Sequence, residues 1–224
     1  MDVAAAANLT DVFGRVGRDF ESQTGIHPVF SFASTAQLTQ QIENGAPFDL
    51  FAAADATHVA ELERRGLILA GTRAVYARGA LALWIPPNSP AKIDRLEDIT
   101  SDTVRFIAVA KPELAPYGQA AVDTLQHLGI WDRVRAKIVY AENISAAKQY
   151  GTSSNADAVF TAYSLVFKES GKVIRVDESL HQPIDQELAV IANRQHVDAA
   201  QKFRAFLLTG SGREILSAYG YTLP

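Results

Sequence analysis

The chain alternates short apolar runs with amphipathic segments of helical period. The first such pair is an apolar run at residues 3–7 followed by a segment at residues 9–24. Within that segment the large apolar side chains recur at spacings that place them on one face of a helix, namely Leu9, Val12, Phe13, Val16 and Phe20. Repeated alternation of this kind predicts an α/β fold with mostly parallel strands.

The same alternation continues to the end of the chain. We predict further strands at residues 29–32, 48–53, 80–85, 106–110, 137–140, 158–160, 172–176 and 187–192. Further helices are predicted at residues 36–43, 57–65, 119–128, 144–150, 197–208 and 211–218. The proline-rich residues 86–90 cannot continue a sheet and therefore end the strand before them.

The order of these elements predicts two lobes. The strands at 80–85 and 187–192 are the natural crossings between them, and together they would form a two-strand hinge. The first lobe is then discontinuous, made of residues 1–80 and 192–224, and the second lobe is residues 81–191. A length of 224 residues suits two modest lobes as well as one large domain.

Composition excludes several classes of function. The chain has no cysteine, which excludes disulfides, thiolate nucleophiles and cysteine-based zinc sites. Its net charge is −4, and no cluster of Lys and Arg could follow a nucleic-acid backbone. No stretch reaches the apolar length of a membrane span.

Residues 1–8 lack the basic region and cleavage site of a signal peptide, so an exported protein would already have lost that peptide.

Common catalytic motifs are also absent. The chain contains no G-x-x-x-x-G-K-S/T, G-x-G-x-x-G, G-x-S-x-G or H-E-x-x-H motif. The five histidines are scattered and fall at no metal-ligand spacing. A triad assembled by the fold is compatible with any spacing, but we find no candidate base with a neighbouring partner. We therefore expect no catalytic residue.

Four junctions share one pattern, in which a strand ends, a small polar residue or a proline follows, and a helix begins. In the first lobe, Asn8 is placed to cap the first helix, and Ser34 with Gln37 has the spacing of a capping box. In the second lobe, Pro116 suits the first turn of a helix, and Asn143 is placed to cap the next one. Capping alone explains any single junction. Two junctions fall in each lobe and none has a basic side chain in its capping turn, so the set favours a site where helix N-termini bind a small anion.

Sequence motifs at these junctions carry a family resemblance. They are A-A-A-A-N-L-T at 4–10, S-F-A-S-T at 31–35, Q-I-E-N-G-A-P-F-D-L-F-A-A-A-D at 41–55, A-P-Y-G-Q-A-A at 115–121, A-E-N-I at 141–144 and Y-G-Y-T-L-P at 219–224. The chain resembles the molybdate-binding proteins of bacterial ABC importers over essentially its whole length. The Q-I-E-x-G-A-P-x-D-L-F block is the most specific part.

The resemblance implies a two-lobed periplasmic binding protein fold, each lobe a mixed, mostly parallel sheet flanked by helices. It also implies a set of residues that hold an oxyanion. The principal candidates are Asn8 and Thr35, each replacing a serine that is usual in the family, with Tyr117 and Ile144 supplying backbone N–H groups. Further candidates are Ala7, Ser34, Thr161 and Tyr163. The replacements at Asn8 and Thr35 would change the size of the pocket and with it the choice among tetrahedral anions.

The function implied is tight binding of molybdate or tungstate in an interlobe cleft and delivery to a membrane permease. We expect a monomer with no cofactor and no nucleic-acid partner, located in the periplasm or, in a Gram-positive source, anchored by a lipid. A donor-only site suits a fully deprotonated dianion and disfavours phosphate, which carries a proton at neutral pH. Sulfate is also a fully deprotonated dianion, so the site must reject it by its smaller size.

Other functions stay open from the sequence. Within the same class, the ligand could be another oxyanion such as sulfate or chromate. An enzyme on the same fold would use Asp55 or His58 as a base. A ligand-sensing regulator would carry a DNA-binding helix-turn-helix, whereas this chain starts directly on a predicted strand.

Overall fold

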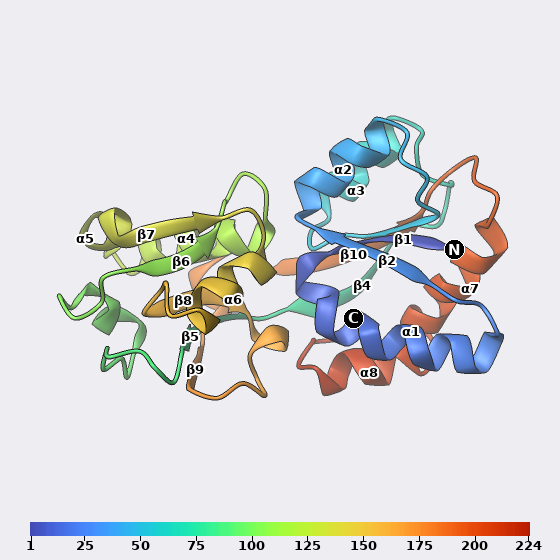
Figure 1. Cartoon of the computed structure of the whole chain (residues 1–224). Coiled ribbons are helices and arrows are strands. Elements are labelled where there is room, and N and C mark those ends of the chain that lie inside the picture. The colour runs from blue at the N-terminus through green and yellow to red at the C-terminus, as the bar shows by residue number, and fades with distance from the viewer. The chain divides into compact units, whose positions relative to one another are not determined.

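The computed structural model describes residues 1–224, which form two compact units. One unit consists of Met1–Gly79 and Asp185–Pro224, and the other is Ala80–Ile184. Each unit contains a five-stranded sheet flanked by helices (Figure 1). The predicted α/β class with two lobes is confirmed.

The sheet of the first unit is mixed. Its strand order is β2 (Val29–Ala33), β1 (Asp2–Ala6), β3 (Leu50–Ala52), β10 (Ile184–Val190) and β4 (Ala74–Gly79). Strand β1 pairs in parallel with β2 and β3, whereas β10 runs antiparallel to β3. The carboxyl ends of β1, β2 and β3 therefore lie along one edge of the sheet.

Helices cover both faces of this sheet. Helix α1 (Thr10–Thr24) follows a short 3-10 turn, η1 (Ala7–Leu9), and shares one face with α7 (Val197–Leu208) and α8 (Gly212–Ala218). The other face carries α2 (Thr35–Glu43) and α3 (Thr57–Arg64), as Figure 1 shows. Successive right-handed crossovers in opposite directions, β1 to β2 and then back to β3, place α1 and α2 on opposite faces.

The small side chains of β1 allow the core of the first unit to pack closely on both faces of the sheet. Val3, Ala4, Ala5 and Ala6 are all buried, so helices can approach the strand from both sides. Beneath α1 and α7 the rings of Phe13, Phe20, Phe30, Phe203 and Phe206 pack with centroids 5.0–6.0 Å apart. A separate hydrophobic cluster beneath α2 and α3 includes Leu38, Ile42, Phe51, Val59 and Leu62.

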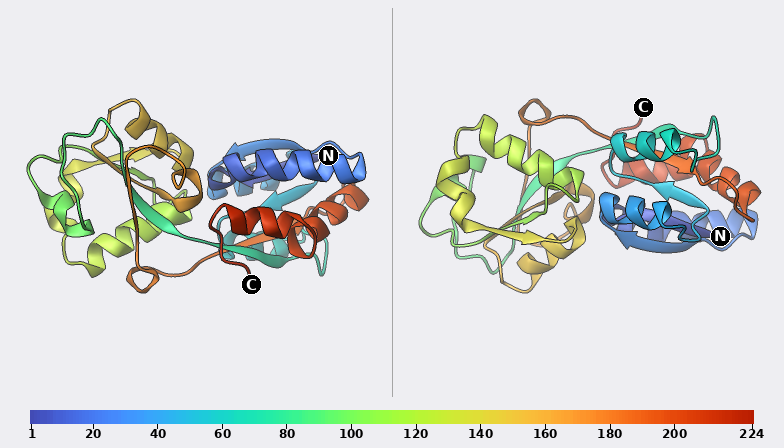
Figure 2. Two further views of the ribbon diagram at one scale, coloured as in Figure 1. Left: turned by 90° about the horizontal axis from the view of Figure 1, so that it is seen from below. Right: turned by 90° about the horizontal axis from the view of Figure 1, so that it is seen from above.

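The sheet of the second unit is built in the same way. Its strand order is β7 (Ile138–Ala141), β6 (Ile107–Ala110), β8 (Ala158–Ala162), β5 (Leu81–Ile85) and β9 (Lys172–Arg175). Strand β6 is parallel to β7 and β8, and β5 is antiparallel to β8 and β9. Figure 2 shows α4 (Pro116–His127) and α6 (Ile144–Thr152) on opposite faces of this sheet. The short elements are α5 (Trp131–Val134), η2 (Leu96–Thr100), η3 (Arg135–Lys137), η4 (Tyr163–Leu165) and η5 (Glu178–Leu180).

Three differences from the sequence analysis have physical causes. The chain returns to the first unit at Asp185 rather than at residue 192, because β10 forms its ladder with β3 of that unit. Strand β4 was missed because its run A-V-Y-A-R-G contains a charged residue, Arg78, which pairs with Asp185 of β10. Helix α5 was missed because a single turn has no measurable period.

Candidate functional site

The predicted residues of the first unit meet at one edge of its sheet. Strands β1 and β2 end side by side, with Ala6 opposite Ala33, and each continues directly into a helical turn. Ala7 and Asn8 therefore lie beside Ser34 and Thr35. Open α/β sheets bind ligands at the carboxyl ends of their strands, and a helix start there offers N–H groups that have no intrahelical acceptor.

Two adjacent hydroxyls at this edge have different roles. The capping box predicted for Ser34 is confirmed, because Gln37 Oε1 accepts from Ser34 Oγ at 2.8 Å and from Ser34 N at 3.3 Å. The Ser34 hydroxyl hydrogen is thus already used. Thr35 Oγ1, in a residue only 1% exposed, instead accepts from the backbone N–H of Ala54 at 3.2 Å. Accepting that bond leaves the hydroxyl hydrogen of Thr35 to be donated elsewhere.

The prediction that Asn8 caps the first helix is wrong. A 3-10 turn separates it from α1, whose N-cap position is Leu9 and carries no side-chain hydrogen bond. The Asn8 side chain is buried, and its Nδ2 donates to Gln186 Oε1 and to Tyr221 Oη, each at 3.0 Å. Gln186 and Tyr221 were missed because they lie 178 and 213 residues away along the chain. No local signal marks Gln186, which stands between Asp185 and Glu187 in β10.

The second unit repeats the arrangement at the ends of β6 and β7. Ala110 lies opposite Ala141 in the register, and α4 and α6 begin shortly after these residues. The predicted cap is confirmed, since Asn143 Oδ1 accepts from the backbone N–H of Ala146 at 2.9 Å. Pro116 occupies the first turn of α4, as predicted. Tyr117 and Ile144 are buried residues in the first turns of α4 and α6.

A glycine sets how closely α4 approaches its strand. A Cβ atom added at Gly118 would lie 2.1 Å from the backbone oxygen of Ala110, which no real side chain tolerates. Only glycine therefore lets the start of α4 lie against the end of β6. Gly118 belongs to the motif A-P-Y-G-Q-A-A, but the sequence alone does not predict this close approach.

The last two predicted residues differ in their surroundings. Thr161 lies on β8, is 0% exposed, and its Oγ1 has no hydrogen-bond partner in the structure. Tyr163 begins the 3-10 turn after β8 and is only half-buried. Its ring packs 4.7 Å from the guanidinium carbon of Arg175, a cation–π contact. Of the two, Thr161 has the stronger physical reason to take a ligand, since a buried hydroxyl without a partner is unfavourable.

Asp55 and His58 form a pair at the start of α3. Asp55 Oδ1 accepts from the backbone N–H of His58 at 2.9 Å, and Asp55 Oδ2 lies 2.8 Å from His58 Nδ1. The hydrogen bond to Asp55 raises the pKa of His58 above its ordinary value of 6.5, and partial burial opposes this rise. This pair corrects the expectation that no candidate base has a neighbouring partner. The pair nonetheless satisfies the first turn of α3, a structural role that accounts for both residues.

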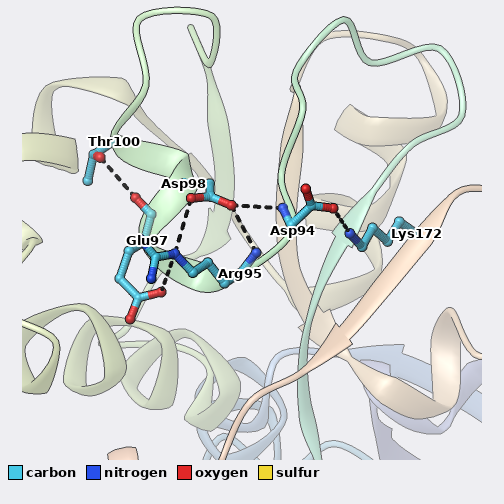
Figure 3. A network of polar contacts seen from close by, with 6 residues as sticks. All are labelled: Asp94, Arg95, Glu97, Asp98, Thr100 and Lys172. Atoms are coloured by element: carbon cyan, nitrogen blue, oxygen red, sulfur yellow. Dashed lines mark hydrogen bonds and ion pairs between the residues drawn. The ribbon is translucent and has the colours of Figure 1, made fainter.

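A charged cluster on the second unit lies before β6, at the other end of that strand from α4 (Figure 3). Asp98 accepts from the backbone N–H groups of Asp94 and Arg95 at 2.9 and 3.0 Å, and these bonds hold the pKa of Asp98 below its usual value. Arg95 pairs with Asp98 and Glu97, and Lys172 pairs with Asp94. Each of the two cations is paired with a carboxylate and Asp98 caps η2, so a structural role accounts for the cluster.

Some kinds of site are not formed. No group of three or more His, Asp or Glu side chains lies close enough to hold a metal ion. None of the helices combines the length and apolar character needed to cross a bilayer. The charged side chains that follow these strands are paired with one another, Asp55 with His58 and Lys111 with Glu142. The chemistry left at the two edges is therefore hydrogen-bond donation by neutral groups.

Two α/β units that each present helix starts at the carboxyl ends of parallel strands define the class of two-lobed solute-binding proteins. The family model for bacterial extracellular solute-binding proteins matches residues 1–222, and the chain belongs to that family.

Its relatives include named molybdate-binding proteins. The chain is 35% identical to the molybdate-binding protein ModA of Azotobacter vinelandii, over 100% of this chain and 90% of that protein. It is 34% identical to ModA of Rhodobacter capsulatus, over 97% of this chain and 86% of that protein. The solved periplasmic molybdate-binding protein of Azotobacter vinelandii superposes with a TM-score of 0.94 at 29% identity, covering 100% of this chain and 99% of that one.

Proposed function

We propose that this chain binds molybdate or tungstate as a transported ligand and delivers it to the permease of an ABC importer. The observation that carries the proposal is the set of helix starts at the carboxyl edges of both sheets, whose first turns offer donors and contain no basic side chain. The similarity to molybdate-binding relatives supports the choice of anion. The protein would act outside the cytoplasm, as a monomer and without a cofactor or catalysis.

The proposed ligand residues come from both units. Thr35 would donate its hydroxyl hydrogen, and Tyr117 and Ile144 would donate backbone N–H groups from the first turns of α4 and α6. Asn8, with Ala7, would contribute through the backbone of its 3-10 turn, because both hydrogens of its amide group are donated inside the first unit. Thr161 and Tyr163 would supply further hydroxyls, since Arg175 contacts the ring of Tyr163 and not its hydroxyl. The Ser34 hydroxyl hydrogen, by contrast, is donated to Gln37.

The chemistry of these groups selects for charge state. Hydroxyl and N–H groups donate, so they satisfy the oxygens of a fully deprotonated tetrahedral dianion. Hydrogen phosphate brings one donor of its own, which would find no acceptor and would remain buried and unpaired. Sulfate differs from molybdate only in size, so discrimination between these two depends on the fit of the pocket.

Calorimetry with molybdate, tungstate and sulfate tests the proposal. We expect tight binding of the first two and little binding of sulfate. A thermal melt gives an independent check, because a ligand at 100 times its dissociation constant adds about 2.7 kcal/mol to the free energy of unfolding. Equal affinity for sulfate and molybdate would reduce the function to general oxyanion binding, and no binding of any of the three would refute it.

A matched pair of threonine variants tests the site. Thr35→Val removes the proposed donor, and since hydrogen bonds to charged groups contribute about 1.5–3 kcal/mol, molybdate binding should weaken roughly tenfold or more. Thr39→Val is the control, because Thr39 is buried one turn later on the same helix and its hydroxyl donates to the Thr35 carbonyl oxygen at 2.9 Å. Equal losses in the two variants would remove Thr35 from the site.

A further inference from the structure

The hydroxyl of Tyr221 holds Asn8 at two points. It accepts from Asn8 Nδ2 at 3.0 Å, and it donates its own hydrogen to the backbone oxygen of Asn8, also at 3.0 Å. The Tyr221 hydroxyl is thus bonded to both the side chain and the main chain of a residue two positions after the end of β1. Both residues are buried, Asn8 at 1% exposure and Tyr221 at 4%.

Local structure brings Tyr221 to this position. Helix α8 ends at Ala218, and Gly220 turns the chain with a φ of +84°, a conformation that favours glycine. The Tyr221 N–H then bonds to the oxygen of Leu216 at 3.2 Å, and Thr222 exchanges two backbone hydrogen bonds with Arg78 of β4, at 3.0 and 2.7 Å. The tail is therefore fixed on both sides of Tyr221.

Gln186 holds the other hydrogen of the Asn8 amide. Its Oε1 accepts from Asn8 Nδ2 at 3.0 Å and from the Tyr76 hydroxyl at 2.8 Å, and the residue is fully buried on β10. An amide nitrogen has two hydrogens, and these two bonds, to Gln186 and Tyr221, use both. The orientation of Asn8 is thus set by three elements that are distant in sequence: β4, β10 and the C-terminal tail.

We propose that Tyr221, supported by Gln186, is a positioning residue of the anion site in the first unit. By fixing the side chain and the carbonyl of Asn8, it removes the rotations that would let the 3-10 turn at Ala7–Leu9 move, and so holds that turn in one position at the edge of the sheet. Bonding the amide inside the unit also keeps Asn8 from acting as a side-chain ligand. This inference rests on the proposed function of the site.

The variant that tests it is Tyr221→Phe, which keeps the ring and deletes only the hydroxyl. We expect the molybdate dissociation constant to rise about tenfold, which corresponds to one lost hydrogen bond of ordinary strength. We also expect the Asn8 side-chain amide hydrogens, measured by NMR, to exchange faster with solvent. Tyr219→Phe is the matched control, two residues earlier and only half-buried, and should change neither quantity. Gln186→Met, which removes the second acceptor but keeps Tyr221, should weaken binding in the same direction.

The outcomes separate the two proposals. If Tyr221→Phe and Gln186→Met lower the melting temperature of the free protein but leave the dissociation constant unchanged, the network is only structural and this inference is overturned while the proposed function stands. A wild-type protein that binds neither molybdate, tungstate nor sulfate overturns the proposed function, and this inference with it. Weaker binding in Tyr221→Phe together with normal binding in Tyr219→Phe supports both.

Discussion

Neighbouring polar residues at the candidate site have different functions because their hydrogen bonds differ. Ser34 and Thr35 carry adjacent hydroxyls, yet the Ser34 hydroxyl donates its hydrogen to Gln37. The Thr35 hydroxyl accepts a hydrogen bond from Ala54, so its own hydrogen is left to be donated to a ligand. Asn8, which the resemblance predicts to replace a serine, has a side chain long enough to reach Gln186 and Tyr221. At the scale of the residue, a side chain's partners determine whether it can bind a ligand.

Replacing Asn8 with serine should therefore destabilise this protein. In Asn8→Ser the shorter side chain cannot reach both partners, which leaves buried polar groups on Gln186 and Tyr221. We expect the free energy of unfolding, measured by denaturant titration, to fall by about 1–3 kcal/mol. Asn44→Ser is the control, since Asn44 is exposed at the end of α2 and should change little. A stability loss no larger than that of the control would contradict the network described for Asn8.

The His58–Asp55 pair predicts a pH dependence of stability. Because the folded pKa of His58 is raised, mainly by the hydrogen bond to Asp55, its contribution is complete below the unfolded value of 6.5 and is lost as pH rises through the folded pKa. Melting temperatures of wild type and His58→Gln, measured from pH 5 to 9, should differ most at the acid end and converge at the alkaline end. A difference in melting temperature between wild type and His58→Gln that grows with pH would contradict the raised pKa of His58.

At the scale of the element, the unit of construction is a strand followed at once by a helix start. Register places Ala6 beside Ala33 in one unit and Ala110 beside Ala141 in the other, so each unit has two helix starts at one sheet edge. The helix must also lie close to its strand, and at α4 this depends on Gly118. Close packing and ligand binding are thus coupled at the first turn of α4.

Two glycine-to-alanine substitutions should have opposite effects. Gly118→Ala places a Cβ 2.1 Å from the Ala110 oxygen, so it must displace α4 and should lower both stability and molybdate affinity. Gly14→Ala, inside α1, meets nothing closer than 3.9 Å and should stabilise the protein by about 0.5–1 kcal/mol. Thermal melts with and without molybdate measure both. Equal affinity in Gly118→Ala and wild type would show that the start of α4 is not part of the site.

At the scale of the whole molecule, the overall charge and the ligand have the same sign. The chain carries −4, and the proposed ligand is a dianion, so long-range electrostatics oppose their encounter. Attraction must come from neutral donors and helix ends that act over short distances. The net charge therefore gives no indication of the ligand.

This balance predicts an unusual salt dependence. Added NaCl screens the repulsion between the protein and the anion, so the association rate of molybdate should rise modestly between about 10 and 150 mM salt, over which the Debye length falls from roughly 30 to 8 Å. Stopped-flow measurement of intrinsic fluorescence tests this. A rate that falls with salt would indicate steering by basic side chains, contrary to the proposed site.

The sequence by itself determined the α/β alternation and most helix starts. The bonds of Ser34 with Gln37 and of Asn143 with Ala146 each span three residues, so a short window of sequence contains both partners. Tertiary structure alone decided the environment of Asn8, the return of the chain at Asp185 and the existence of β4. These depend on which strands become neighbours, and β10 brings Gln186 beside a residue from the start of the chain. Local hydrogen bonds are readable from spacing, whereas partners across a sheet are fixed only by the order of its strands.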